Sequence, residues 1–249
     1  MFKLMMSGIV SGFIAQGLLT TIQSSATEIS DSTSHTVAEA LQGQNGPVDE
    51  SECFLAGTLV ATDRGECKIE QLKIGDRVKT VDGKLESVKW IGKQTLSVEH
   101  AHPLRALPVQ VKAGALGNNL PVRDLYVSPN HALLVDGILV NAGALINGIS
   151  IVQIRPETET FDYYHVELWR HALILTEGTP TESFIPQSEE CHDNFENGEA
   201  FSALYPHKNT LAYMPLSLPR VSSQRQLPRT IAKRLNKVAL NLYGQTAVR

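Results

Sequence analysis

The fold is decided by residues 53–60, which read CFLAGTLV, and by residues 65–78, which read GECKIEQLKIGDRV. Short runs of Val, Ile and Leu alternate there with turns that contain glycine, and this texture continues to about residue 184. Runs of this length, bounded by turn residues, are typical of β-strands. No helical pattern separates them, so a parallel sheet with crossover helices is not expected. We therefore expect residues 53–184 to form one compact all-β domain.

Four turn signals predict how the strands of this domain pair. They are Asp-Gly at 82–83 and at 136–137, Asn-Gly at 147–148, and Asp-Arg-Gly at 63–65. Asx-Gly supplies two residues that tolerate a positive φ, which a two-residue hairpin turn requires. The domain should therefore consist of short antiparallel strands and hairpins.

The N-terminal region differs from this domain in composition and charge. Residues 1–52 contain one Lys and six acids. Residues 1–26 combine the positive charge of Lys3 with an apolar stretch and small residues at its end, which is the pattern of a signal peptide. The alternative is an N-terminal helix of a cytoplasmic protein, so export and a cytoplasmic location both stay open. Residues 27–52 are polar and predict a flexible linker.

A C-terminal extension follows at residues 185–249. Its last 49 residues, 201–249, contain eight Lys and Arg residues and no acid. Five prolines within 185–228 leave no room for a long helix or a central strand there. A short amphipathic helix is predicted near 230–243, with apolar residues at helical spacing and basic residues elsewhere. We expect this helix to pack on the β domain; weak contact with a membrane or an acidic surface is the alternative.

The quoted stretches resemble the Hint (Hedgehog/intein) superfamily, and in particular its bacterial Hint subgroup. Domains of that superfamily begin with a Cys, a Gly-Thr turn and an I-E-x-L-x-x-G-D-x-V segment, which here are Cys53, residues 57–58 and residues 69–78. A second block at 125–135 resembles the family's T-x-x-H block, with Ser128 and His131 in the Thr and His places. Residues 164–178 resemble the late hairpin of the fold. The resemblance covers about residues 53–184 and implies the intein-like horseshoe fold.

The resemblance implies that the protein processes itself. Cys53 is then the nucleophile that attacks the carbonyl before it, so that an N-to-S acyl shift converts the Glu52–Cys53 amide into a thioester. His131 protonates the departing nitrogen, because an imidazole changes charge near neutral pH. The Ser128 hydroxyl holds or polarises the scissile carbonyl. The substrate is the protein's own N-terminal segment, and water, an amine or a thiol accepts the acyl group.

Departures from the family limit the reaction. Inteins that splice end in His-Asn, whereas Glu182 and Ser183 stand in those places, so Asn cyclisation and full splicing are not expected. His165 stands where many inteins carry Asp, and it acts either as a base or acid on the thioester or as a structural residue. His171 is its rival, because an even spacing along a strand places both on one face.

Two other functions fit the same residues. One is a degenerate Hint fold that serves as a binding or structural module, and the other is a cysteine hydrolase that uses Cys53 and His131 in trans. No cofactor is expected, since phosphate-loop and dinucleotide-binding motifs are absent from the sequence. His100 and His102 lack further ligands at suitable spacing, so no metal site is expected. Acids outnumber Lys and Arg by 26 to 22, which disfavours a nucleic-acid partner.

Overall fold

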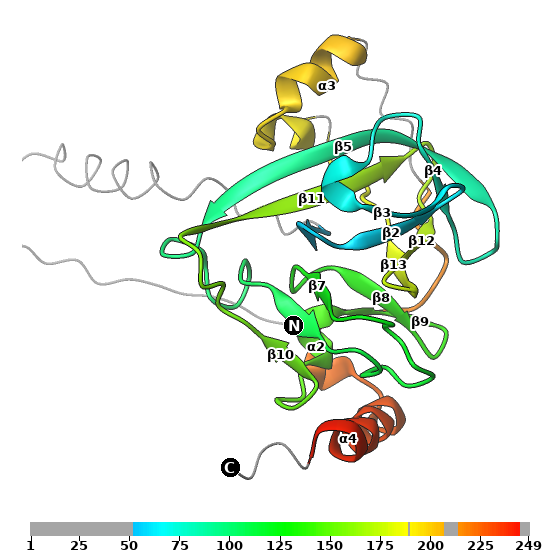
Figure 1. The fold of residues 1–249 in the computed structure, drawn as a ribbon, viewed down its shortest axis with the longest axis vertical. Helices are drawn as coiled ribbons and strands as arrows, with labels where there is room; N and C mark the ends of the chain where they lie inside the picture. The colour runs from blue at the N-terminus through cyan, green and yellow to red at the C-terminus, as the bar shows by residue number, and fades with distance from the viewer. Residues whose placement is uncertain (1–51, 189, 207–213, 245–249) are drawn as a thin grey trace, which may run out of the picture. The chain divides into compact units, whose positions relative to one another are not determined.

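Fourteen short strands pair into one sheet in the part of the chain that the computed structural model describes, residues 52–188, 190–206 and 214–244. In chain order the strands are β1 (Phe54–Leu55), β2 (Leu59–Thr62), β3 (Gly65–Lys68), β4 (Arg77–Lys79), β5 (Leu85–Ser97), β6 (Val109–Val111), β7 (Leu125–Val127), β8 (Ala132–Val135), β9 (Ile138–Asn141), β10 (Ile151–Gln153), β11 (Thr160–Leu168), β12 (Leu173–Thr176), β13 (Thr179–Glu182) and β14 (Arg220–Val221). The helices are α2 (Ala142–Leu145), α3 (Gly198–Leu204) and α4 (Arg229–Tyr243), and 3₁₀ turns lie at Ile69–Gln71, Cys191–Asn194 and Gln224–Gln226. The mainly β fold expected from the sequence is confirmed (Figure 1).

The sheet folds around one main core. Its strands follow the order β10-β6-β7-β1-β11-β5-β4-β2-β12-β13-β8-β9-β14, and β3 is attached to β2. The long strand β5 belongs to both halves, because its first residues pair with β4 and the rest pair with β11. Apolar residues from both halves form a single main cluster, which includes Ile151 near one end of the strand order and Val221 at the other. Figure 1 shows the sheet folded over on itself.

Three of the four predicted hairpins are confirmed: β2–β3, β4–β5 and β8–β9. At the β8–β9 turn, Asp136 and Gly137 have φ values of 49° and 82°, as a two-residue turn of this hand requires. The hairpin predicted at Asn147-Gly148 is wrong, because β10 pairs with β6 instead. Asn147 Oδ1 accepts the backbone N–H groups of residues 149, 150 and 151, each at 3.0 Å. The Asn side chain thus closes a loop between α2 and β10.

Strand β11 separates two layers of side chains. Val166 and Leu168 point into the main core, and Tyr164 packs against it. Phe161 and Tyr163 instead join a second apolar cluster that contains Cys53. Since neighbouring residues of a strand point to opposite faces, His165 and Glu167 share the face of Phe161 and Tyr163.

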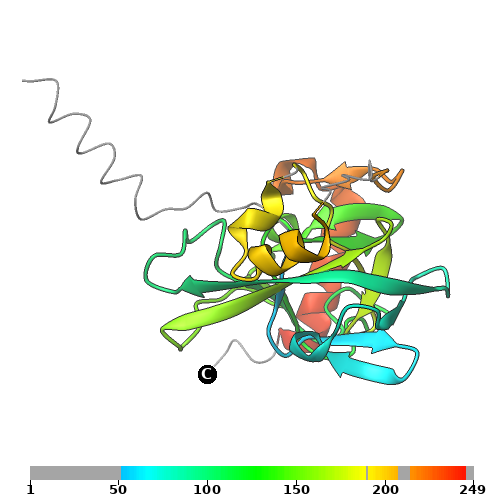
Figure 2. The same ribbon diagram turned by 90° about the horizontal axis from the view of Figure 1, so that it is seen from above.

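The extension covers this second face of the sheet. Figure 2 shows α3 lying over β5 and β11. The ring of Phe201 lies 5.2 Å from that of Trp90, which belongs to β5. Beneath them Glu167 is fully buried, with Oε1 2.7 Å from Lys89 Nζ and Oε2 2.7 Å from His192 Nε2. A buried carboxylate is tolerated only when it is paired, and here the extension supplies one of its partners.

Helix α4 packs against the β core at another place. Ile231 and Leu235 belong to the main apolar cluster. Arg234 binds both carboxylate oxygens of Asp136, at 3.1 and 2.9 Å, and donates to the Leu116 carbonyl at 2.6 Å. The helix therefore fixes the β8–β9 turn. Contact between its exposed basic residues and a membrane or an acidic surface stays a prediction.

Two predictions from the sequence concern the N-terminal region. The expected leader at 1–26 and all but the last residue of the linker at 27–52 lie outside the described residues. Within the described ranges, no helix is both long and apolar enough to cross a membrane.

The packing of α4 predicts a large effect at one position. Leu235→Ala should lower the free energy of unfolding by about 3 kcal/mol, because Leu235 is buried in the core and its truncation leaves a cavity. Leu240→Ala is the matched control, since that side chain of the same helix is 58% exposed and should change stability by less than about 0.5 kcal/mol. Urea denaturation measures both. Equal losses would contradict the docking of this helix.

Candidate functional site

Cys53 directly precedes β1, a central strand of one half of the sheet. The two-residue strand β1 lies between β7 and β11, because Phe54 pairs with Val127 on one side and with Tyr164 on the other. Cys53 is 3% exposed and packs in an apolar cluster. The Cys53 thiol therefore belongs to the interior of the domain.

The turn after β7 holds the backbone of Cys53. Ser128 Oγ accepts the Cys53 N–H at 3.1 Å, and the Ser128 N–H donates to the Cys53 carbonyl at 3.0 Å. His131 Nδ1 lies 3.1 Å from the same carbonyl oxygen. The structure thus brings together Cys53, Ser128 and His131, which the sequence analysis selected.

The start of helix α2 holds the turn at residues 128–131 through two backbone hydrogen bonds. The N–H of Ala142 donates to the His131 carbonyl at 2.9 Å, and the N–H of Gly143 donates to the Pro129 carbonyl at 2.8 Å. A Cβ atom at Gly143 would lie 3.2 Å from the Pro129 oxygen, so the close approach favours glycine. The orphan N–H groups at the start of a short helix thereby hold the turn that carries Ser128 and His131.

The observed contacts differ in detail from those expected. Ser128 Oγ contacts the nitrogen of the Glu52–Cys53 bond, whereas the sequence analysis assigned this hydroxyl to the carbonyl of that bond. His131 contacts the carbonyl of Cys53 itself, whereas it was assigned to the nitrogen. The chemical roles of both residues stay predictions. Ser128 contacts the nitrogen of the Glu52–Cys53 bond, and His131 contacts the next carbonyl along the chain.

His131 is uncharged at neutral pH. Its side chain is fully buried, and burial lowers its pKa to about 4, against the opposing effects of the Glu182 carboxylate and the Cys53 carbonyl. Its ring centroid lies 4.1 Å from that of Phe54. A neutral imidazole can accept a proton before it donates one.

His165 occupies an aromatic cage on β11. Its ring lies 5.3 Å from Phe184 and 4.5 Å from Phe195, both edge-on, and among the described residues neither ring nitrogen has a hydrogen-bond partner. Burial, and secondarily the charge of His131, lowers its pKa to about 3. His165 is therefore a neutral imidazole, and it lies close enough to His131 for a positive charge on His131 to lower the pKa of His165. Its role as acid or base stays a prediction.

His171 does not share the strand position of His165. Strand β11 ends at Leu168 after an irregularity in its register, and His171 lies in the connection to β12. There its Nε2 atom is 2.9 Å from Oε1 of Glu182, which is fully buried on β13. Arg220 of β14 forms an ion pair with the same carboxylate. Burial alone would raise the pKa of Glu182, but contacts with His171 and Arg220 outweigh it and lower that pKa.

Sequence reasoning missed the group formed by Glu182, His171 and Arg220. Glu182 was noted only as the replacement for an intein His, and Arg220 was not selected at all. One signal was available, because an acid inside a strand that is otherwise buried must find a cationic or hydrogen-bonding partner. The sequence does not show where that partner lies.

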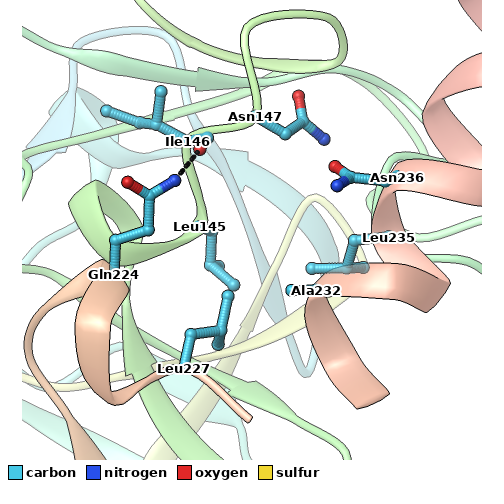
Figure 3. Close-up of a pocket in the computed structure, with 8 residues that line it drawn as sticks. All are labelled: Leu145, Ile146, Asn147, Gln224, Leu227, Ala232, Leu235 and Asn236. Carbon is cyan, nitrogen blue, oxygen red and sulfur yellow. Dashed lines mark hydrogen bonds between the residues drawn. The ribbon is translucent and has the colours of Figure 1, made fainter. Parts of the chain in front are cut away.

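The pocket drawn in Figure 3 lies elsewhere, between α2, the turn at Gln224–Gln226 and α4. It has a volume of about 210 Å³. It is lined by Leu145, Ile146, Asn147, Gln224, Leu227, Ala232, Leu235 and Asn236. Gln224 Nε2 donates to the Ile146 carbonyl at 3.1 Å across one side. The pocket is a seam between the extension and the β domain, and Cys53 is not among its lining residues.

The described residues contain no cluster of His, Cys, Asp and Glu with an arrangement suited to a metal ion. His100 and His102 are exposed on the loop after β5, and His100 Nδ1 lies 3.1 Å from Ser97 Oγ.

Comparisons with known proteins find one matching family model and several similar solved structures. The family model described as "Hint domain" matches residues 52–188. No curated protein sequence matches the chain. Solved structures of inteins and intein-like domains are similar to about half of it, among them the following three. The gp41-1 intein is 17% identical over 52% of this chain and 97% of its own, with a TM-score of 0.38. The bacterial intein-like domain from Clostridium thermocellum is 14% identical over 53% and 97%, with a TM-score of 0.39, and a DnaB intein from Synechocystis sp. PCC 6803 is 15% identical over 54% and 100%, with a TM-score of 0.37.

The two buried imidazoles predict a pH-dependent stability. An unfolded His binds its proton near pH 6.5, whereas His131 and His165 do so only near pH 4 and 3 in the fold. The unfolded state therefore binds more protons, and the free energy of unfolding should fall as the pH decreases from about 6.5 toward 4.

His165→Phe should reduce this fall by up to about 1.4 kcal/mol per pH unit, because it removes one of the two groups and suits an aromatic cage. Urea denaturation between pH 4 and 7 measures the slope. A slope equal to that of the unmodified chain would show that His165 is not held neutral in the fold.

Proposed function

The chain belongs to the Hint domain family, and we propose that it uses this fold to cleave its own Glu52–Cys53 peptide bond through a thioester at Cys53. A Hint fold implies a capacity for self-processing in general. The cleavage reaction itself is supported chiefly by one observation: Ser128 and His131 together contact the N–H and the carbonyl of the buried residue Cys53.

The first step exchanges an amide for a thioester. Cys53 Sγ attacks the carbonyl carbon of Glu52, a C–S bond forms, and the C–N bond breaks. The proton that leaves the thiol ends on the nitrogen, which becomes the α-amine of Cys53. His131 carries this proton, because it is neutral beforehand and so can act first as base and then as acid. Ser128 steadies the nitrogen through its 3.1 Å contact.

The second step releases the N-terminal segment. Water, an amine or a thiol attacks the thioester carbonyl, its proton passes to Cys53 Sγ, and the thiol is restored. His165 is the candidate base for this step, because it is neutral and so can accept a proton. It also lies near enough to His131 for a charge on one ring to affect the pKa of the other. Its aromatic cage would have to open for a nucleophile to reach it.

The downstream chain supports cleavage without splicing. Ser183 N–H donates to the Ala172 carbonyl at 2.9 Å, and Phe184 N–H donates to the Val166 carbonyl at 2.8 Å. The chain thus continues through the interior at the place where an intein would be cut, and Glu182 and Ser183 offer no Asn side chain to cyclise. The burial of Cys53 also favours action on its own chain over hydrolysis in trans.

Dithiothreitol should split the purified chain before Cys53, because a thiol intercepts a thioester but does not cut an amide. Intact-mass spectrometry measures the fragments. Cys53→Ala should abolish the split, since no atom then accepts the acyl group. His131→Ala should slow it by about a hundredfold or more. Ser128→Ala should slow it about fivefold, because one neutral hydrogen bond contributes about 1 kcal/mol.

Cys67→Ala is the control, because that thiol lies on β3 and takes no part in the proposed site. It should split at the rate of the unmodified chain. A cut that persists in Cys53→Ala, or ligation of residues 1–52 to the C-terminal segment, would refute the mechanism. A chain that stays intact under all conditions would identify a degenerate Hint fold.

A further inference from the structure

Two groups of the C-terminal extension contact Glu182 or its partner His171, near His131. The N–H of Leu216 donates to His171 Nδ1 at 3.2 Å. Arg220 pairs with Glu182 and also lies 3.4 Å from Asn141 Oδ1. Both Leu216 and Arg220 lie outside residues 52–188, to which the family model extends.

The strand order explains how residues distant in sequence meet here. β13 pairs with β8 through Thr181 and Leu133, and β8 starts directly after His131. β9 follows β8, and β14 adds to β9 in parallel, so that Arg220 pairs with Leu139. Four adjacent strands therefore place Glu182 and Arg220 near the turn that carries His131.

The two contacts from the extension have distinct effects on Glu182. Nδ1 of His171 accepts the Leu216 N–H, which leaves Nε2 as the nitrogen that faces Glu182, 2.9 Å from Oε1. Arg220 adds a permanent positive charge. His171 and Arg220 both lower the pKa of the fully buried Glu182 carboxylate, so Arg220 fixes its position while His171 still stabilises its charge when Arg220 is removed.

We propose that Arg220 is a positioning residue for the self-processing reaction: it holds the ionised Glu182 beside His131, so that the site is complete only when the extension has docked. This inference rests on the proposed function. It makes cleavage depend on the folding of the segment that carries Arg220, which lies beyond the residues matched by the Hint domain model.

Two opposite charges lie near His131, so the proposal can be tested by the direction in which the His131 pKa shifts when one of them is removed. Among the described residues, the groups that act on His131 are the Glu182 carboxylate from β13, Arg220 from β14, His165 from β11 and the backbone carbonyls of Cys53 and Glu182. Glu182 raises the pKa of His131, and Arg220 lowers it. Removal of either charge leaves the other unbalanced, so the two variants should shift the His131 pKa in opposite directions. A loss of packing alone would not do so.

The first experiment measures the His131 pKa by NMR in a Cys53→Ala background, which keeps the chain intact. Glu182→Gln should lower this pKa and Arg220→Met should raise it, each by about one unit. Arg220→Lys and the double variant Glu182→Gln/Arg220→Met should stay within about 0.3 unit of the parent. Shifts in one direction, or no shift in either single variant, would overturn the inference.

The second experiment measures the thiol-induced split in the chain that retains Cys53. Arg220→Met should slow it about tenfold or more, because a displaced catalytic group is costly, and Arg220→Lys should recover most of the rate. Arg225→Met is the matched control on the exposed turn before α4 and should leave the rate unchanged. If the unmodified chain never splits, the proposed function fails and the NMR series alone decides the role of Arg220. If it splits and Arg220→Met splits equally fast, the role of Arg220 is refuted and the proposed function stands.

Discussion

The hydrogen bonds between the peptide of Cys53 and the turn at residues 128–131 are the constraint on which the rest of the site depends. β1 has only two residues, so its pairing with β7 and β11 begins after Cys53 and does not by itself fix the bond that precedes it. Ser128 supplies that constraint at the nitrogen. The same turn brings His131 Nδ1 to 3.1 Å from the Cys53 carbonyl, which is the position from which we propose that it carries a proton.

Burial keeps the two imidazoles near this turn neutral, whereas ionic contacts outweigh burial at Glu182. His131 and His165 are neutral because charged imidazoles would lose their hydration. The two buried carboxylates, Glu167 and Glu182, are both paired, and each draws one partner from the extension: His192 for Glu167 and Arg220 for Glu182. Removal of one partner from a fully buried pair such as Glu167–His192 costs about 3–5 kcal/mol, and the cost is smaller for Arg220, whose side chain is 37% exposed. The extension is therefore part of the electrostatics of the domain.

The sequence was sufficient for features that depend on local chemistry. Asp136-Gly137 specifies its hairpin because both residues tolerate a positive φ. The block pattern brought Cys53 and the turn at 128–131 into one site. Asn147-Gly148 carries the same turn signal, yet its side chain bonds three following N–H groups, and nothing in a dipeptide distinguishes the two outcomes.

Contacts between distant parts of the chain were beyond sequence reasoning. Glu182 and Arg220 are 38 residues apart across a segment rich in proline, and their pairing follows from the addition of β14 to β9. The choice of Ser128 between the nitrogen and the carbonyl depends on the orientation of one peptide plane, for which a sequence holds no signal.

The central claim is that Glu52 is transferred to the thiol of Cys53. Mass spectrometry of the chain after treatment with neutral hydroxylamine tests it most directly, because the reagent records the acyl group that it intercepts. The account predicts one fragment that ends in a hydroxamate at Glu52 and a second that begins at Cys53. A fragment that ends at Glu52 as the ordinary carboxylate, formed equally well by the Cys53→Ala chain, would contradict it.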